Sequence, residues 1–280
     1  MMKKLDMIFG AFGKAGIIIN IKKTKLFQMK VDYLGFEVSK EGIGTVKAYT
    51  TAITEIPVPQ TITETKSLIG KFSYYRRFIE GFSEIARPLV EAYTTAEKRN
   101  EKNIKITGDV TEAVQKLKEK ITSTPILAHP DWQSQEPFKL KTDFSCNALG
   151  AKITQMQKDE NGKMQERVIL FDSKKTTATE ACYQSNKGEM LAFIFFCNKH
   201  KFLLYPRKFI FFTDHIALKS IKTMKFPRSL SLRLLDIVSN FNCSVAYRKE
   251  ELHEDVDFLS RHAIAKTADK DNDSNTHEEN

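Results

Sequence analysis

The spacing of apolar residues changes near residue 138, from the period of an α-helix to that of a β-strand. Upstream, apolar side chains recur at helical spacing, at Leu68, Phe72, Tyr75 and Ile79. The capping-box pattern Thr61-x-x-Glu64 opens this helix. From Phe138 onward, apolar and polar residues alternate in the way that half-buried strands require. The chain therefore predicts an α/β fold in which a mainly helical unit precedes a sheet.

The second half predicts a mixed sheet flanked by helices. Strand patterns cover residues 138–143, 149–155, 168–171, 208–213 and 244–248. Turn residues from Lys158 to Gly162 separate the second and third strands. Helical patterns cover one long segment, 179–200, and two later ones, 228–240 and 254–262.

The first 44 residues predict a short helix and then strands over 16–21 and 31–38. So small a set of elements cannot bury enough apolar surface to stand alone, which indicates a remnant of a larger sheet. At the other end, residues 266–280 are polar and acidic and are expected to be disordered.

Charge and cysteine content narrow the class of protein. The net charge is +9, and the acidic tail conceals a more basic body, which fits a polyanionic partner. The four cysteines form no Cys-x-x-Cys pair, as is typical of a reducing intracellular compartment. No stretch approaches about 18 apolar residues, and no signal peptide is recognisable, so neither membrane insertion nor secretion is expected.

Four carboxylates stand where folding alone explains them poorly: Asp143, Glu189, Asp214 and Asp257. They lie in or beside apolar segments, and a buried carboxylate costs several kcal/mol unless it is paired, hydrogen-bonded or bound to a cation. Taken singly, each acid also fits an edge, cap or salt-bridge role. If they converge, divalent cations relieve their repulsion, and two ions about 3.5–4 Å apart are the arrangement that hydrolyses phosphodiesters. Oxygen ligands favour Mg²⁺ or Mn²⁺.

Each of the four acids lies within a short sequence motif, and the four motifs follow one another along the chain. These motifs are Lys141–Ser145, Lys187–Ala192, Phe212–His215 and Asp257–Arg261. They resemble the ribonuclease H of gypsy-like long-terminal-repeat retrotransposons. The resemblance implies a ribonuclease H-like fold and endonucleolytic hydrolysis of the RNA strand of RNA–DNA hybrids. It also implies that Asp143, Glu189, Asp214 and Asp257 are catalytic and hold two Mg²⁺ or Mn²⁺ ions, with Asp255 as a rival for the last position.

The resemblance extends upstream. Residues 33–36 resemble the primer-grip hairpin that ends a reverse transcriptase palm, residues 68–89 resemble the thumb, and residues 123–131 resemble the connector. The implied domains are a palm remnant at 1–44, a thumb and connector at 45–130, a ribonuclease H-like domain at 131–265 and the tail at 266–280. Seven residues are expected to contact nucleic acid: Tyr33, Gly35, Lys71, Arg76, Arg77, Arg228 and Arg233.

The implied partners are an RNA–DNA hybrid and the rest of a Pol polyprotein, including a polymerase palm and an integrase. The expected location is the cytoplasm, a virus-like particle or the nucleus. No Asp-Asp pair occurs in the chain, so the polymerase motif Tyr-x-Asp-Asp is absent and DNA synthesis by the isolated chain is not expected. The alternative is a non-catalytic, connection-like domain that binds nucleic acid, or an inactive truncated copy of an element.

Overall fold

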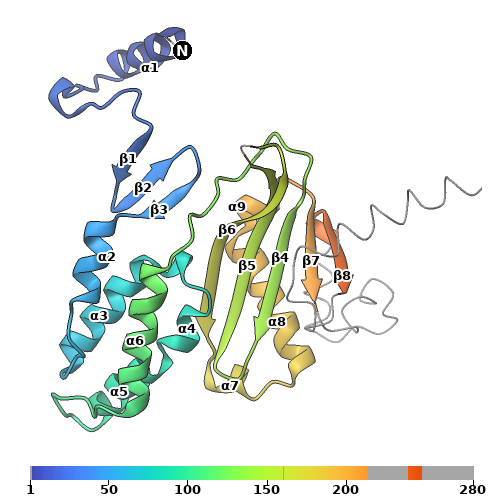
Figure 1. Ribbon diagram of the computed structural model, residues 1–280. Coiled ribbons are helices and arrows are strands. Elements are labelled where there is room, and N and C mark those ends of the chain that lie inside the picture. The colour runs from blue at the N-terminus through green and yellow to red at the C-terminus, as the bar shows by residue number, and fades with distance from the viewer. Residues whose placement is uncertain (1, 160, 214–238, 248–280) are drawn as a thin grey trace, which may run out of the picture.

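The computed structural model describes residues 2–159, 161–213 and 239–247, and it centres on a five-stranded mixed sheet (Figure 1). The strands are β4 (Phe138–Phe144), β5 (Ala148–Lys158), β6 (Met164–Lys175), β7 (Phe209–Thr213) and β8 (Cys243–Tyr247). Their order is β6-β5-β4-β7-β8. The first three strands form an antiparallel meander, whereas β7 runs parallel to both β4 and β8. The α/β fold with a mixed sheet is thereby confirmed.

Helix α8 (Ser185–Lys199) lies across one face of this sheet, and the short helix α9 (Lys201–Leu204) continues from it (Figure 1). Phe193 and Phe196 of α8 are fully buried against Phe138, Leu140 and Phe211. The expectation of one helix over 179–200 is wrong. A capping box at Thr177 starts the separate helix α7 (Ala178–Ala181), and the chain is extended at Gln184 (φ −61°, ψ 149°) before α8 begins.

A helical unit precedes the sheet. It consists of α2 (Lys47–Thr54), α3 (Ile62–Tyr74), the 3₁₀ turn η2 (Arg76–Phe78), α4 (Phe82–Ile85), α5 (Arg87–Lys98) and α6 (Gly108–Thr122). The capping box of α3 is confirmed, because the Thr61 hydroxyl accepts the Glu64 N–H at 3.2 Å and the Glu64 carboxylate accepts the Thr61 N–H at 3.3 Å. Phe72, Leu89 and Leu117 are buried at its centre.

The N-terminal segment contains helix α1 (Met2–Lys14), the 3₁₀ turn η1 (Ile21–Lys23) and a small antiparallel sheet of β1 (Lys30–Tyr33), β2 (Phe36–Ser39) and β3 (Ile43–Thr45). Leu34 and Gly35 have φ of 47° and 76° and form the two-residue turn between β1 and β2. The strand expected over 16–21 is wrong, because these residues follow α1 without joining a sheet. Within the segment described, α1 buries none of its side chains.

The helical unit packs beside the edge strand β6, where η2 and α4 contact it (Figure 1). This packing covers an edge that would otherwise expose strand backbone groups. A second connection joins β3 to the segment before the sheet, because Ile43 and Leu127 exchange backbone hydrogen bonds of 2.8 and 2.9 Å. None of the described helices has the length and apolar character needed to cross a membrane. The predicted domain limits stay predictions.

Candidate functional site

Asp143 and Glu189 are brought to the same end of strand β4. Asp143 is the penultimate residue of β4 and is exposed, whereas Glu189, in the first half of α8, is only 5% exposed. The backbone N–H of Phe144 donates a hydrogen bond to Glu189 Oε1 at 3.1 Å. The Glu189 carboxylate is therefore held against the residue that directly follows Asp143.

Gly188 explains how the helix approaches the strand so closely. A Cβ atom on Gly188 would lie 2.1 Å from Cδ1 of Phe144, closer than any side chain tolerates. Glycine inside a helix costs about 1 kcal/mol relative to alanine, so its presence here needs a reason, and the Phe144 ring supplies one. The sequence motifs did not single out Gly188 as structurally necessary, although an isolated helical glycine beside an acid is a signal that could have done so.

The neighbouring strand β7 ends at the same end of the sheet as β4. Strands β4 and β7 are parallel, with Lys141 paired to Phe212, so their carboxyl ends point the same way. In open α/β sheets, ligands bind beyond the carboxyl ends of such strands. Thr213 is buried as the last residue of β7.

Several of the residues expected at the site have no described position. Asp214 follows Thr213 in the sequence but lies outside the described residues, as do Asp257 and its rival Asp255. The expected nucleic-acid contacts Arg228 and Arg233 also lie outside them. Across residues 2–159, 161–213 and 239–247, no three His, Cys, Asp or Glu side chains gather closely enough to hold a metal ion.

The two acids that are described have the oxygen donors that a divalent cation prefers. Mg²⁺ is commonly bound through one or two carboxylates, with substrate phosphates and water completing its coordination. Asp143 faces solvent, where a substrate can reach it, and Glu189 is a buried carboxylate of the kind that needs a hydrogen bond or a cation. The pair can therefore supply part of a ligand set to a metal that also contacts a phosphodiester.

The expected contacts to nucleic acid in the first half of the chain occupy different environments. Tyr33 is 63% exposed beside the β1–β2 turn, and Lys71 is exposed on α3. The Tyr75 hydroxyl donates to the carbonyl oxygen of Gly35 at 3.3 Å, which fixes this turn on the end of α3. Burial lowers the pKa of the Arg77 guanidinium, which remains charged at neutral pH.

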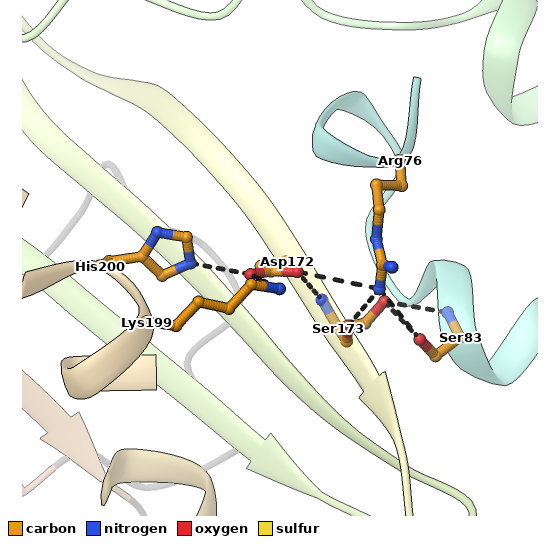
Figure 2. A network of polar contacts seen from close by, with 6 residues as sticks. All are labelled: Arg76, Ser83, Asp172, Ser173, Lys199 and His200. Carbon is orange, nitrogen blue, oxygen red and sulfur yellow. Dashed lines mark hydrogen bonds and ion pairs between the residues drawn. The ribbon is translucent and has the colours of Figure 1, made fainter. Parts of the chain in front are cut away.

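Arg76 has partners that the sequence did not indicate. Its guanidinium donates to the Ser173 carbonyl oxygen and to the Ser83 hydroxyl, the latter at 3.3 Å, and lies 3.8 Å from the Asp172 carboxylate (Figure 2). Arg76 therefore joins the helical unit to strand β6. A contact between Arg76 and nucleic acid stays a prediction.

Known proteins resemble this chain in sequence. Residues 106–211 match the family described as an RNase H-like domain found in reverse transcriptase. The chain is 30% identical over 267 residues to the retrovirus-related Pol polyprotein from transposon opus of Drosophila melanogaster, covering 92% of this chain and 26% of that protein. It is also 30% identical over 268 residues to the Pol polyprotein from transposon gypsy of the same organism, covering 93% and 25%. The chain thus spans about a quarter of these relatives.

A solved structure shares the fold. The foamy viral protease-reverse transcriptase in complex with RNA/DNA hybrid superimposes with a TM-score of 0.71 at 23% sequence identity, covering 89% of this chain and 33% of that one. The same viral protein in complex with dsDNA gives a TM-score of 0.69 at 24% identity, covering 89% and 51%. At this identity the likeness shows the fold alone.

Proposed function

Because this chain is a relative of gypsy-type Pol polyproteins and carries an RNase H-like domain of the kind found in reverse transcriptases, we propose that it hydrolyses the RNA strand of RNA–DNA hybrids. The observation that carries the proposal is the hydrogen bond from the Phe144 N–H to Glu189, which holds a buried carboxylate beside Asp143. Both acids lie at the carboxyl end of β4, and α/β folds bind their ligands beyond the carboxyl ends of their strands.

The two carboxylates have different tasks in this proposal. Asp143 is exposed at the end of β4, where it would hold the divalent ions that the scissile phosphate contacts. Glu189 is held by the backbone of Phe144, so its charge would stay in a fixed position during the reaction. A preorganised charge of this kind needs no reorganisation as the transition state forms.

Asp143, Glu189, Asp214 and Asp257 would hold two divalent ions. When bound, such ions neutralise charge at the phosphate and activate water, which is the chemistry that a phosphodiester requires. In our proposal Asp143 would contribute to holding both ions, Glu189 and Asp214 would help to hold one of them, and Asp257 would help to hold the other. The roles of Asp214 and Asp257 are inferred from their sequence motifs.

The hybrid is the proposed substrate because the foamy viral protease-reverse transcriptase, which shares this fold, has a structure in complex with an RNA/DNA hybrid. The chain also carries a net charge of +9, which suits a phosphate backbone. Ribose 2′-hydroxyls and the shape of the minor groove would distinguish the RNA strand from DNA.

A cleavage assay tests this substrate. We expect an end-labelled RNA to be cut when it is paired with DNA and to stay intact when it is single-stranded or paired with RNA. Binding of the hybrid without hydrolysis would contradict the proposal and favour the alternative, a connection-like domain or an inactive copy of the element.

A further inference from the structure

Asp172 is a buried carboxylate on the edge strand β6, 6% exposed, at the centre of a polar network (Figure 2). Lys199 Nζ lies 2.6 Å and His200 Nε2 lies 2.8 Å from Asp172 Oδ2, and both residues are at the end of α8. The Ser173 N–H donates to Asp172 Oδ1 at 2.8 Å, and Arg76 Nη2 approaches Oδ1 at 3.8 Å. One acid therefore holds cationic partners from two parts of the fold.

The next residue, Ser173, binds the helical unit directly. Its hydroxyl accepts the Ser83 backbone N–H at 2.9 Å and lies 3.0 Å from the Ser83 hydroxyl. Arg76 donates to the Ser173 carbonyl oxygen and to the Ser83 hydroxyl. These contacts cross from η2 and α4 to β6, and they are polar and directional, so they define one orientation of the two units.

This contact lies in the same row of the sheet as Asp143. Asp143 pairs with Gly150 on β5, and Gly150 pairs with Ser173 on β6. Two strand spacings amount to about 10 Å, so the helical unit is attached to the sheet about 10 Å from the exposed acid. Next to Ser173, Asp172 contacts Lys199 and His200 at the end of α8. Glu189 lies about 16 Å from this end along the helix axis.

The charges around Asp172 make it the essential member of the network. Burial by itself raises the pKa of Asp172, but hydrogen bonds from His200 and Lys199 outweigh burial, and the pKa lies below its ordinary value of 3.8. Asp172 is therefore ionised at neutral pH. Without this charge, Arg76 and Lys199 would both lose the carboxylate that they approach from the two units.

We propose that Asp172 is a positioning residue that fixes the angle between the helical unit and the sheet, and so sets where along a bound hybrid the RNA is cut. The inference rests on the proposed function, because the cut position has meaning only if the sheet domain cleaves. The helical unit carries the expected phosphate contacts Lys71 and Arg77, so its angle determines which part of a long hybrid reaches Asp143. A short hybrid that reaches only the sheet does not depend on this angle.

The test compares Asp172→Asn and Ser83→Ala with the wild type and with Glu112→Gln. The control removes an exposed ion pair within α6, Glu112 with Lys116 at 2.6 Å, and leaves the network intact. Cut positions are mapped on a long and a short hybrid. In parallel, pulsed electron paramagnetic resonance measures the distance between a spin label on the exposed Cys182 and one on Lys98→Cys. Both labels are placed in a Cys146→Ser background, because Cys146 is also exposed.

We expect both network variants to broaden the label distance and to spread the cuts on the long hybrid, while the short hybrid is cut at the wild-type rate. An unchanged label distance, or an equal loss of cleavage on both hybrids, would overturn the positioning role. Ser83→Ala keeps the buried charge, so it decides the matter if Asp172→Asn does not fold. If the wild type cuts neither hybrid, the proposed function fails, and the label distances still decide whether Asp172 fixes the angle.

Discussion

The backbone N–H of Phe144 and the carboxylate of Glu189 are joined by a hydrogen bond of 3.1 Å. This bond ties α8 to the residue after Asp143, so the spacing of the two acids depends on backbone geometry. Gly188 keeps the helix close enough for the bond to form, because any larger residue would strike the Phe144 ring. The site is therefore built by close packing as well as by charge.

Replacing Glu189 by glutamine should separate charge from structure. The amide oxygen of the new side chain can still accept the Phe144 N–H, so we expect Glu189→Gln to fold as the wild type does. Cleavage should fall by about 100-fold or more, because loss of even an outer-shell partner of a metal ligand costs about 10–100-fold. Thermal unfolding and hybrid cleavage measure the two effects, with Glu112→Gln as the control. Cleavage at the wild-type rate would remove Glu189 from the catalytic set.

Gly188→Ala should be destabilising, against the usual trend. In most helices this change stabilises by about 1 kcal/mol, but here the new methyl group would overlap Phe144. Overpacking of this kind costs about 1–3 kcal/mol. Gly70→Ala is the matched control, because Gly70 also lies within a helix, α3, and a Cβ atom there would meet nothing within 4 Å. Urea unfolding should shift in opposite directions for the two variants, and shifts in the same direction would disprove the close packing at Gly188.

The Asp172 network predicts a stability that depends on pH. The pKa of Asp172 is lowered in the folded chain, so its contribution is present above the ordinary value of 3.8 and is lost as the pH falls below it. At neutral pH, Asp172→Asn should cost about 2 kcal/mol, as expected for weakening hydrogen bonds to a buried charged group whose cationic partners are partly exposed. The difference in unfolding free energy between wild type and variant should stay constant from about pH 7 to about pH 5 and should shrink as the pH falls below about 4. Chemical unfolding across this range measures it, and a difference that stays constant below about pH 4 would contradict the assignment.

Lys71 should contribute to the salt dependence of hybrid binding. It is exposed on α3, and each phosphate contact that is lost reduces the slope of log K against log salt by about 1. We expect that reduction for Lys71→Gln and no change for Lys116→Gln, whose ammonium already pairs with Glu112 on α6. Fluorescence anisotropy with a labelled hybrid at several KCl concentrations gives both slopes. Equal slopes for wild type and Lys71→Gln would place Lys71 away from the phosphates.

Local sequence patterns predicted the elements that depend on local chemistry. The alternation from Phe138 predicted β4, and the Thr61 capping box predicted the start of α3, because both signals reside in a few adjacent residues. The long helix over 179–200 was wrong, since the apolar pattern continues across the extended Gln184 and does not show the break.

Features of the site that depend on distant residues could be predicted only in part. Asp143 and Glu189 were chosen because each acid stands in an apolar setting, but only the fold shows that Glu189 contacts the backbone of Phe144. Asp172 was not chosen, because its partners Arg76, Lys199 and His200 are separated from it by 96, 27 and 28 residues. Pairing at such separations leaves no periodic signal in a single sequence.

Hydrolysis of an RNA–DNA hybrid by the wild type and by Asp143→Asn, each with Mg²⁺ and with EDTA, tests the central claim most directly. The substitution keeps the shape of the side chain and removes the exposed charge at the end of β4. We predict RNA fragments only for the wild type with Mg²⁺. Equal hydrolysis by the wild type in EDTA, or unchanged hydrolysis by Asp143→Asn, would contradict catalysis by these carboxylates.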